Sequence, residues 1–385
     1  MNLNSFDEWS QLREIVVGSA QNYISHEREL SFDLFFHDNL AQDNTRYEWY
    51  YPRLTSGSSA ENGRVKTKIK TRYVEELNED VQGLAETLGS LGVRVLRPMD
   101  LDQSTGDVAT LAWSASVVPP LNLRDIALVV GDEVIETPPM VRSRYFENQF
   151  LKPIYNDYFA RGGRWTVMPR PIMTDASFDT SYADDATHSA GGPTEPIDGR
   201  KQVSPYDVGF EMLFDGAQVL RLGTDLMVNV STKNHEMACD WLERHLEGRF
   251  NIHRVHAISD SHIDSMVIAL RPGLLLLRSP DIQAKLPDWL QKWDYIVPPV
   301  PEANNFPSYD DDDIVLTSKY IDMNVLSVNE DTVLVNEASP ELRKLLEQRG
   351  FDAVPVRHRH RRLFGGGFHC FTLDTVRDGT AESYR

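Results

Sequence analysis

The chain repeats one order of secondary structure: strand, turn, strand, helix, strand. In residues 266–300 the apolar runs MVIAL and LLLLRS flank a turn, and a predicted helix (PDIQAKLPDWLQKW) and strand (DYIVPPV) follow. Residues 323–357 repeat this order with MNVLSV, TVLVNE, SPELRKLLEQRG and FDAVPVR. Period-two apolar runs, β-branched residues and Gly, Asn or Asp at the turns favour these assignments. One hairpin with one helix cannot bury both faces alone, so the units must share a core with their neighbours.

Three more segments fit the pattern. Residues 126–170 contain IALVV, EVIET, a long predicted helix over 142–163 and RWTVMP. Residues 209–257 supply FEMLFD, DLMVNVS, a helix and NIHRVHA. Residues 14–98 supply EIVVGS, a long insertion over 20–65, a helix and VRVLRP. Five such units predict an α/β fold that closes around an axis as a single domain over 1–385, with strands inside and helices outside.

Two stretches interrupt the repeat. Residues 174–207 are polar and rich in Ser, Asp, Gly and Pro, and a loop of this length inside a compact domain is usually functional or mobile. We expect it to cover the active site. Residues 301–313 (PEANNFPSYDDDD) are interpreted as a solvated loop and not as a metal site, because adjacent carboxylates on an extended chain point in different directions.

Charge and hydropathy exclude several classes of partner. The formal net charge of −19 disfavours binding to nucleic acid and to anionic membranes, and it is compatible with a cationic substrate. No apolar run reaches the roughly 18 residues of a membrane span. The N-terminal residues lack the pattern of a signal peptide, so a cytoplasmic location is the default expectation.

The two cysteines are too few for a disulfide framework. Cys239 lies in a predicted amphipathic helix and is expected to be a core residue. Cys370 ends the run GGGFHC, whose glycines permit unusual backbone conformations and close approach to a ligand. With His369 beside it and Arg361 and Arg362 upstream, the thiol is expected to have a lowered pKa and to be reactive.

Other polar residues also lie where one unit gives way to the next. His262 and Asp264 in SHID would share one face of a strand, Asp215 ends a predicted strand, and Asp175 opens the long loop. In a closed ring these positions would converge near Cys370. A thiol, an imidazole and three carboxylates, without metal-ligand spacing, indicate covalent catalysis on a cationic electrophile such as a guanidinium group.

Several of these segments resemble the arginine-dependent amidinotransferases, a family that includes glycine amidinotransferases and enzymes of antibiotic and toxin pathways. The resemblance rests on GGGFHC with the FTLDTVRDGTAESY that follows it, and on SHID, FDGAQVLRLGTDLMV, IMTD, RSRYFENQFLKPIYNDYFARGGRW and LTSKYIDMNVL. It covers about residues 110–385 well and the first hundred more loosely. It implies a five-bladed α/β propeller of ββαβ units and transfer of the amidino group of L-arginine to a primary amine, with release of ornithine. It also implies natural-product biosynthesis, no metal or organic cofactor, and, by analogy, a homodimer.

The resemblance further implies roles for individual residues. Cys370 would be the nucleophile and His262 the acid and base, assisted by Asp215. The substrate-binding residues would include Asp175 and Asp264 at the guanidinium group, and Ser318 near the donor carboxylate.

The chain departs from the glycine amidinotransferases beside the predicted base. Ser261 replaces their methionine and Ser259 their asparagine, and these smaller side chains predict a roomier pocket and an acceptor larger than glycine. The family's carboxylate-binding arginine aligns with Ile282 here, and Arg278 lies four residues earlier. Either Arg278 takes this role, or a different residue does.

Three alternatives remain open from sequence. The chain could be a glycine amidinotransferase proper. It could be an arginine deiminase-like hydrolase that admits water to the same site. It could also be an inactive protein that binds guanidino compounds, although the presence of Cys370, His262 and Asp215 argues against this reading. The FHC segment and the extended predicted helix over 142–163 favour a transferase over a hydrolase.

Overall fold

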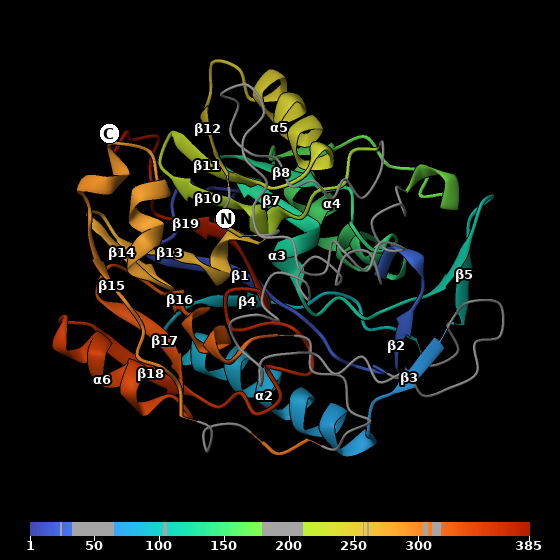
Figure 1. Ribbon diagram of the computed structural model, residues 1–385, viewed down its shortest axis with the longest axis horizontal. Coiled ribbons are helices and arrows are strands. Elements are labelled where there is room, and N and C mark those ends of the chain that lie inside the picture. The colour runs from blue at the N-terminus through green and yellow to red at the C-terminus, as the bar shows by residue number, and fades with distance from the viewer. Residues whose placement is uncertain are drawn as a thin grey trace, which may run out of the picture.

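Five three-stranded sheets form the blades of a propeller in the computed structural model (Figure 1). The structure describes residues 1–23, 25–32, 65–102, 106–178, 211–256, 258–259, 262–302, 307–309 and 317–385. In blade order the sheets are β19(Thr372–Arg377)-β1(Leu12–Val17)-β4(Arg94–Leu96), β7(Ala127–Val130)-β8(Glu133–Glu136)-β9(Arg164–Val167), β10(Val219–Leu222)-β11(Asp225–Val230)-β12(Asn251–His256), β13(Val267–Arg271)-β14(Leu274–Leu277)-β15(Asp294–Ile296) and β16(Leu326–Ser327)-β17(Thr332–Asn336)-β18(Asp352–Val356). The predicted fold class is confirmed.

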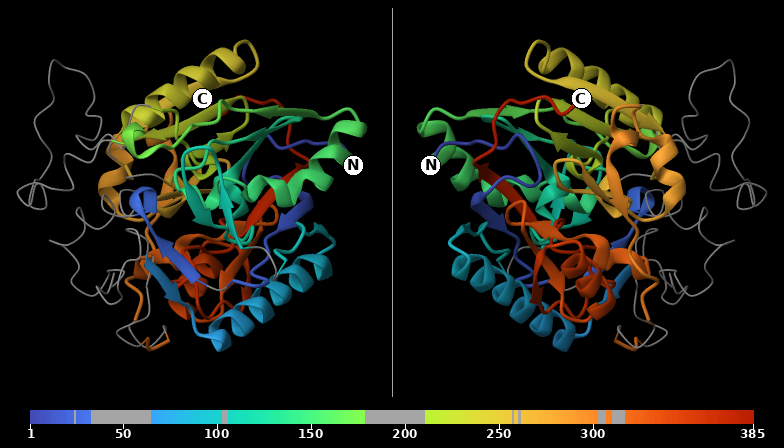
Figure 2. Two further views of the ribbon diagram at one scale, coloured as in Figure 1. Left: turned by 90° about the vertical axis from the view of Figure 1, so that its right-hand side faces the viewer. Right: turned by 90° about the vertical axis from the view of Figure 1, so that its left-hand side faces the viewer.

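Every blade pairs its strands in the same way. The first two strands are antiparallel and the last two are parallel, so a crossover joins the second strand to the third. The crossovers contain the helices α2 (Thr71–Ser90), α4 (Lys152–Ala160), α5 (Lys233–His245) and α6 (Pro340–Gln348). These helices lie on the outside of the molecule, as the ring model predicts (Figures 1 and 2).

Neighbouring blades share hydrophobic cores. One cluster joins Leu128 of the second blade to Val228 of the third, and another joins Ile268 of the fourth to Val333 of the fifth. Equivalent clusters occupy the remaining three interfaces, including the one between the fifth blade and the first. Each repeat unit therefore buries its second face against the next unit. This agrees with the inference from sequence that one unit alone cannot bury both of its faces.

The end of the chain closes the ring, which the sequence pattern did not predict. Residues 14–98 lack an inner strand of their own, and β19 fills this place by pairing antiparallel with β1. The N-terminal segment then crosses three blades through the bridges Asn4 to Val376, Ser5 to Gly131 and Asp7 to Leu222. Both terminal segments thus hold the first blade to its neighbours.

Two predicted helices are wrong in part. Residues 280–293 form two short 3-10 helices, Pro280–Lys285 and Leu290–Lys292, because Pro287 lacks a backbone donor and restricts the residue before it. Residues 142–163 contain the 3-10 helices Arg142–Arg144 and Glu147–Leu151 before α4 begins, and Pro153 occupies the first turn of α4.

The predicted strand FEMLFD is also wrong. The first strand of the third blade is β10, and the polypeptide before it forms the 3-10 helix η6 (Gly216–Gln218). Asp215 caps η6 in a reciprocal arrangement with the Gln218 side chain, so the apolar run ends in a capped turn. The strand pair turns at Gly223, whose φ of 73° favours glycine.

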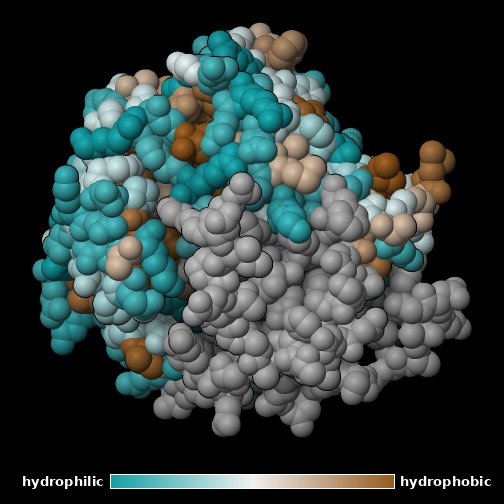
Figure 3. Space-filling model, turned by 45° about the horizontal axis from the view of Figure 1, so that its top comes forward, coloured by the Kyte–Doolittle hydropathy of each residue, from teal (hydrophilic) through white to brown (hydrophobic). Residues whose placement is uncertain are grey.

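Several expectations lie outside the described residues. They include nearly all of the loop over 174–207, most of the insertion over 20–65 and most of the acidic loop over 301–313. Within the insertion, the described strands β2 (Ser25–Arg28) and β3 (Val65–Lys68) form a hairpin. No described helix has the length and apolar character that a membrane crossing requires. The described surface visible in Figure 3 is mostly hydrophilic.

Candidate active site

A short helical turn precedes the inner strand of four blades and brings polar residues to the centre. These turns are α3 (Leu123–Ile126) before β7, η6 before β10, η7 (Ile263–Ser265) before β13 and η11 (Lys319–Met323) before β16. Contacts join α3 to η6, η6 to η7 and η7 to η11, and α3 also touches β19, which follows Cys370. Equivalent ends of the repeat therefore converge as predicted.

The glycine run before Cys370 is required by close packing. Gly365 has a φ of 68°. A Cβ atom on Gly366 would lie 2.5 Å from Asn122 Oδ1, and one on Gly367 would lie 2.7 Å from Asn324 Cβ. The close approach predicted from sequence is thus to two asparagines of the protein. Asn324 also accepts a hydrogen bond from the Cys370 backbone N–H at 2.9 Å, which fixes the residue that carries the thiol.

Asp264 lies directly beside the thiol. The Sγ atom of Cys370 donates to Asp264 Oδ2 at 3.5 Å, and His369 Nδ1 donates to the same oxygen at 2.7 Å. Burial opposes ionisation of Asp264, but the hydrogen bond from His369 together with the charges of His369 and His262 outweighs it and lowers the pKa of this carboxyl. Asp264 is therefore stabilised in its charged form although its side chain is buried.

His262 is held between two carboxylates. Its Nε2 lies 2.9 Å from Asp215 Oδ2, and its Nδ1 lies 3.7 Å from Asp125 Oδ1. Burial alone would lower the pKa of His262, but Asp125 and Asp215 outweigh this effect and raise it to about 9. The imidazole is therefore charged at neutral pH and has a proton that it can donate. His262 caps η7 and Asp264 lies within that turn, so the strand predicted for SHID is wrong although both residues reach the site.

Asp125 is a site residue that the sequence analysis missed. It lies in α3 just before β7, in the same place relative to its blade as Asp215 and Asp264 in theirs. Its Oδ2 accepts from Arg144 at 2.6 Å, while its Oδ1 is buried and has no hydrogen-bond partner among the described residues. Burial raises the pKa of Asp125. An aspartate shortly before the inner strand recurs in four units, as Asp125, Asp215, Asp264 and Asp322, and this recurrence was the signal that could have identified it.

The expected lowering of the Cys370 pKa is contradicted. Burial raises the pKa of the thiol well above its ordinary value, and the nearby carboxylates add to the effect. The three residues named from sequence as neighbours of the thiol have other partners. His369 binds Asp264 and Glu8, Arg361 binds Asp322 at 2.6 Å, and Arg362 donates to the Thr317 carbonyl. None of these contacts is with the sulfur atom, which is why their nearness in sequence does not lower the pKa of the thiol.

Asp175 occupies a different environment from the other predicted carboxylates. Its side chain is 81% exposed, and it accepts from Arg142 Nη2 at 2.7 Å. Asp264 and Asp125 are buried, and both influence the charges of His262 and Cys370. The contacts of Asp175 thus give no support to its predicted role at the guanidinium group. The buried position of Asp125 beside His262 suits that role better.

The remaining predicted substrate-binding residues fall into two groups. Ser318 caps η11 by accepting from the Tyr320 N–H, and Arg278 lies over the Tyr320 ring. Ser259 is held through its backbone by Asn229, while Ser261 is outside the described residues. Ile282 is 1% exposed inside a hydrophobic cluster, so it is a core residue and not a ligand-binding one.

One group of site residues has the spacing of a metal site. Ligand atoms of Asp125, Asp215 and His262 lie within 4.8 Å of one another, the only such group among the described residues. The imidazole already hydrogen-bonds to Asp215, however, and the cation of Arg144 already pairs with Asp125. We therefore interpret the group as a proton-handling one, and the sequence-based expectation of no metal stays a prediction.

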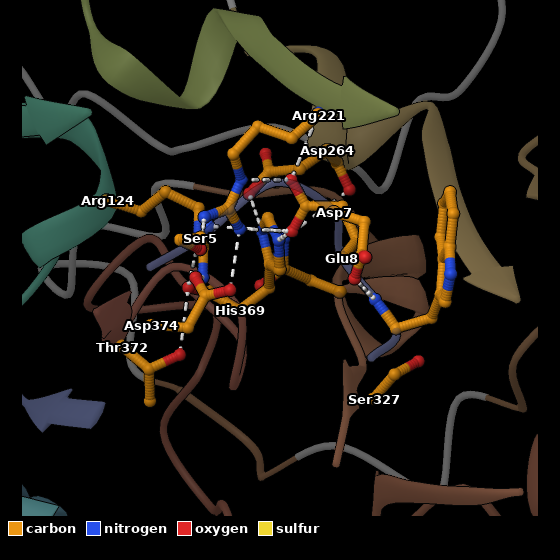
Figure 4. Close-up of polar contacts among 12 residues, drawn as sticks. Ser5, Asp7, Glu8, Arg124, Arg221, Asp264, Ser327, His369, Thr372 and Asp374 are labelled. Carbon is orange, nitrogen blue, oxygen red and sulfur yellow. Dashed lines mark hydrogen bonds and ion pairs between the residues drawn. The ribbon is translucent and has the colours of Figure 1, made fainter. Parts of the chain in front are cut away.

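A buried ionic network adjoins Asp264 (Figure 4). Arg221 binds Glu8 at 2.7 Å and Asp374 at 2.6 Å, and Arg124 binds Asp374 at 2.6 Å. His369 links this network to Asp264. Its members come from the N-terminal segment, from three blades and from β19, so the charges that orient His369 also tie the ring together.

Sequence comparison places the chain close to amidinotransferases. It is 32% identical over 382 residues to inosamine-phosphate amidinotransferase 1 of Streptomyces glaucescens, with 98% of each chain covered. It is 31% identical to the mitochondrial glycine amidinotransferase of Danio rerio, covering 98% of this chain and 83% of the relative. No family model matches the sequence.

Solved structures agree with this result. SxtG, an amidinotransferase from Microseira wollei in the saxitoxin biosynthetic pathway, aligns with a TM-score of 0.76 at 28% identity, over 100% of this chain and 99% of that one. The inosamine-phosphate amidinotransferase StrB1 of Streptomyces griseus has the same TM-score at 30% identity, over 99% of both chains. A dimethylarginine dimethylaminohydrolase has a TM-score of 0.53 at 12% identity over 94% of this chain and 99% of that one, which shows a shared fold alone.

Proposed function

Because the chain belongs to the amidinotransferase family, we propose that it transfers the amidino group of L-arginine to a primary amine through a covalent adduct on Cys370. One observation carries this proposal. Asp125 and Asp264 each bury a carboxylate oxygen that has no hydrogen-bond partner among the described residues, and Asp264 lies beside the thiol. Buried unsatisfied oxygens are unfavourable unless a ligand supplies donors. A planar guanidinium group, with several N–H donors and a permanent charge, satisfies both.

Binding of the guanidinium group also activates the nucleophile. In the free protein, burial and two carboxylates hold the pKa of Cys370 high. The bound cation neutralises those carboxylates and adds a positive charge near the sulfur, which favours the thiolate. The substrate thereby generates the nucleophile that attacks it: Cys370 stays protonated until the donor arrives, and its proton is then released to bulk water.

The first half-reaction forms the adduct. The thiolate of Cys370 attacks the guanidinium carbon, and charged His262 gives its proton to the nitrogen that bears the ornithine side chain. The C–N bond breaks, ornithine leaves as an amine, and a positively charged amidino-thioether remains on Cys370. His262 is now neutral, and Asp215 keeps its ring in place for the next step.

The second half-reaction reverses these proton transfers. The acceptor amine attacks the amidino carbon and loses a proton to neutral His262. The C–S bond breaks, the guanidino product leaves and the thiolate is restored. In an assay with guanidino-labelled L-arginine and a panel of amines, we expect ornithine and a labelled guanidino product in equal amounts. Citrulline as the main product would identify a hydrolase instead.

The identity of the acceptor amine is supported by fewer observations than the transfer reaction itself. The relatives named above include a glycine amidinotransferase and enzymes named for inosamine phosphate and for saxitoxin biosynthesis. Ser259 and Ser261 beside His262 are small, which supports an acceptor larger than glycine, such as an amine of a natural-product pathway. In the amine panel, Ser261→Met should narrow the range of acceptors, and an unchanged range would contradict this part.

The choice between Asp125 and Asp175 is directly testable. Asp125→Asn removes the charge from one guanidinium-binding oxygen pair and should reduce kcat/KM for L-arginine by roughly 10- to 100-fold, the effect of one charge-assisted hydrogen bond. Asp175→Asn changes an exposed side chain in the same way and should leave kcat/KM nearly unchanged. The opposite ranking would restore the sequence-based assignment of Asp175.

The pH dependence of kcat/KM should reflect the protonation of His262. Its pKa of about 9 means that the charged form predominates below that pH and is lost above it, so kcat/KM for L-arginine should fall above about pH 9. Asp215 stabilises the charged imidazole. Asp215→Asn should therefore lower the pKa and move this alkaline limb down by roughly one pH unit or more. A limb that stays near pH 9 in the variant would assign it to another group.

A further inference from the structure

Asp125 shares one arginine with a second buried carboxylate, Glu147. Arg144 donates two hydrogen bonds to Glu147, from Nε to Oε2 at 2.6 Å and from Nη2 to Oε1 at 3.2 Å. Its Nη1 donates to Asp125 Oδ2 at 2.6 Å. Glu147 is 1% exposed and Asp125 is 2% exposed. With both carboxyls ionised, the three side chains therefore have a net charge of −1 in a buried place, and only one cation is bonded to the two anions.

The surroundings of Glu147 favour a protonated carboxyl in the free protein. Burial raises the pKa of Glu147 to about 7, and the charges of Asp125 and Asp215 add to this effect while Arg144 opposes it. The ionisable groups that face Glu147 are Arg144, Asp125 of α3, Asp215 of η6, Tyr155 of α4 and Tyr23 before β2. Burial raises the pKa of both tyrosines, so they stay neutral. Among the described residues, Arg144 is the only cation bonded to Glu147.

A donor guanidinium group at Asp125 changes this balance of charge. Asp125 Oδ1 has no hydrogen-bond partner among the described residues, and the proposed function assigns this oxygen to the donor. A cation bound there neutralises Asp125, so that Arg144 balances the charge of Glu147 alone. Added positive charge favours the ionised form of a nearby carboxyl. Glu147 is therefore expected to lose its proton when the donor binds.

We propose that donor binding is coupled to the release of a proton from Glu147, a positioning residue that acts on Asp125 through Arg144. The inference rests on the proposed function, because it takes the donor guanidinium group as the ligand of Asp125. The O–H bond of the Glu147 carboxyl breaks, its proton passes to solvent water, and no other bond changes. Ionised Glu147 leaves the three side chains with one negative charge that attracts a cation, whereas protonated Glu147 leaves them neutral. Donor affinity should therefore rise as the pH rises through about 7, the pKa of Glu147.

The experiment measures proton release when L-arginine binds to the Cys370→Ser variant. This variant lacks the thiol, so the proton that Cys370 loses on donor binding does not contribute. Calorimetric titrations at pH 7 in buffers of different ionisation enthalpy should show release of about half a proton per site, because a group with a pKa of about 7 is half protonated at that pH. The Kd for L-arginine should fall by roughly 3- to 10-fold from pH 6 to pH 8.

Glu147→Gln in the Cys370→Ser background identifies the source of the proton. Glutamine stays neutral, as protonated Glu147 is, and it has nearly the same shape. The double variant should bind L-arginine about as tightly as its parent at pH 6, and its Kd should not fall toward pH 8. Equal weakening at both pH values would indicate a merely structural role and would overturn the coupling. The measurement on Cys370→Ser alone keeps Glu147 and tests the coupling without this substitution.

Glu133→Gln in the same background is the matched control. Glu133 on β8 is also 1% exposed, but it pairs with Arg249 at 2.7 Å and not with Arg144. Its substitution should change neither the proton release nor the pH dependence of Kd. Binding of L-arginine without proton release, or unchanged release after Glu147→Gln, would overturn the coupling. If L-arginine does not bind and the wild-type protein forms no adduct, the proposed function is overturned together with this inference.

Discussion

Cys370→Ser should abolish transfer, with ornithine release falling by roughly 10⁴-fold or more, as losses of a catalytic nucleophile do in other enzymes. Hydroxyl groups ionise far less readily than thiols, and the serine would lie beside the same carboxylate of Asp264. The variant should still fold, because serine is close to cysteine in size and the hydrogen bond from the backbone N–H to Asn324 is kept. The measurements are ornithine release and the intact mass of the protein after incubation with L-arginine.

The other cysteine is the control for this result. Cys239 is fully buried in α5 within the cluster between the second and third blades, and burial raises the pKa of its thiol. Cys239→Ala should leave the adduct and the rate of transfer intact, with at most a modest loss of stability. An adduct that persists in Cys370→Ser and disappears in Cys239→Ala would contradict the assignment of the nucleophile.

Arg221→Met should lower the free energy of unfolding by about 3–5 kcal/mol, the usual effect of removing one partner from a buried ion pair. Arg221 is 1% exposed and binds both Glu8 and Asp374, so its loss leaves two buried carboxylates without their main counter-charge. The burial of Asp374 opposes its ionisation, and Arg221 is the largest of the charges that hold its pKa low. Denaturant unfolding followed by tryptophan fluorescence measures the change.

The control for this prediction is an exposed ion pair in the first blade, which the network also joins through Asp374 on β19. Arg13 on β1 pairs with Asp378, just after β19, and both side chains are about half exposed. Water screens such pairs, so Arg13→Met should leave the free energy of unfolding nearly unchanged. If the two variants unfold alike, the buried network does not hold the ring closed, and the shared hydrophobic cores alone do so.

Features that recur along the chain could be predicted from the sequence. The order strand, turn, strand, helix, strand predicted the blades, and the placement of Asp215, His262 and Cys370 between units predicted their convergence. Local regularity failed where proline or side-chain hydrogen bonds overrode it, as at Pro287 and in the capped turn at Asp215. The periodicity of apolar residues does not predict these local effects.

Features formed by distant contacts could not be predicted from local pattern. β19 completes the blade of β1 across the whole length of the chain, and only the closed ring brings the two together. Asp125 was missed because a single aspartate before a strand is common. Its recurrence across the units could have singled out the position, but its role depends on contacts with His262 and Arg144 that only the folded chain makes. The expected low pKa of Cys370 failed for the same reason, since Arg361 and Arg362 are near in sequence but bind elsewhere.

The central claim is a covalent amidino group on Cys370 that an amine can remove. The most direct measurement incubates the protein with guanidino-labelled L-arginine alone, records its intact mass and the labelled peptide, and then adds an amine panel. The account predicts one added amidino group on the peptide that contains Cys370, an equal amount of ornithine, and discharge of the label by particular amines. Citrulline release without an adduct that amines can discharge would contradict it.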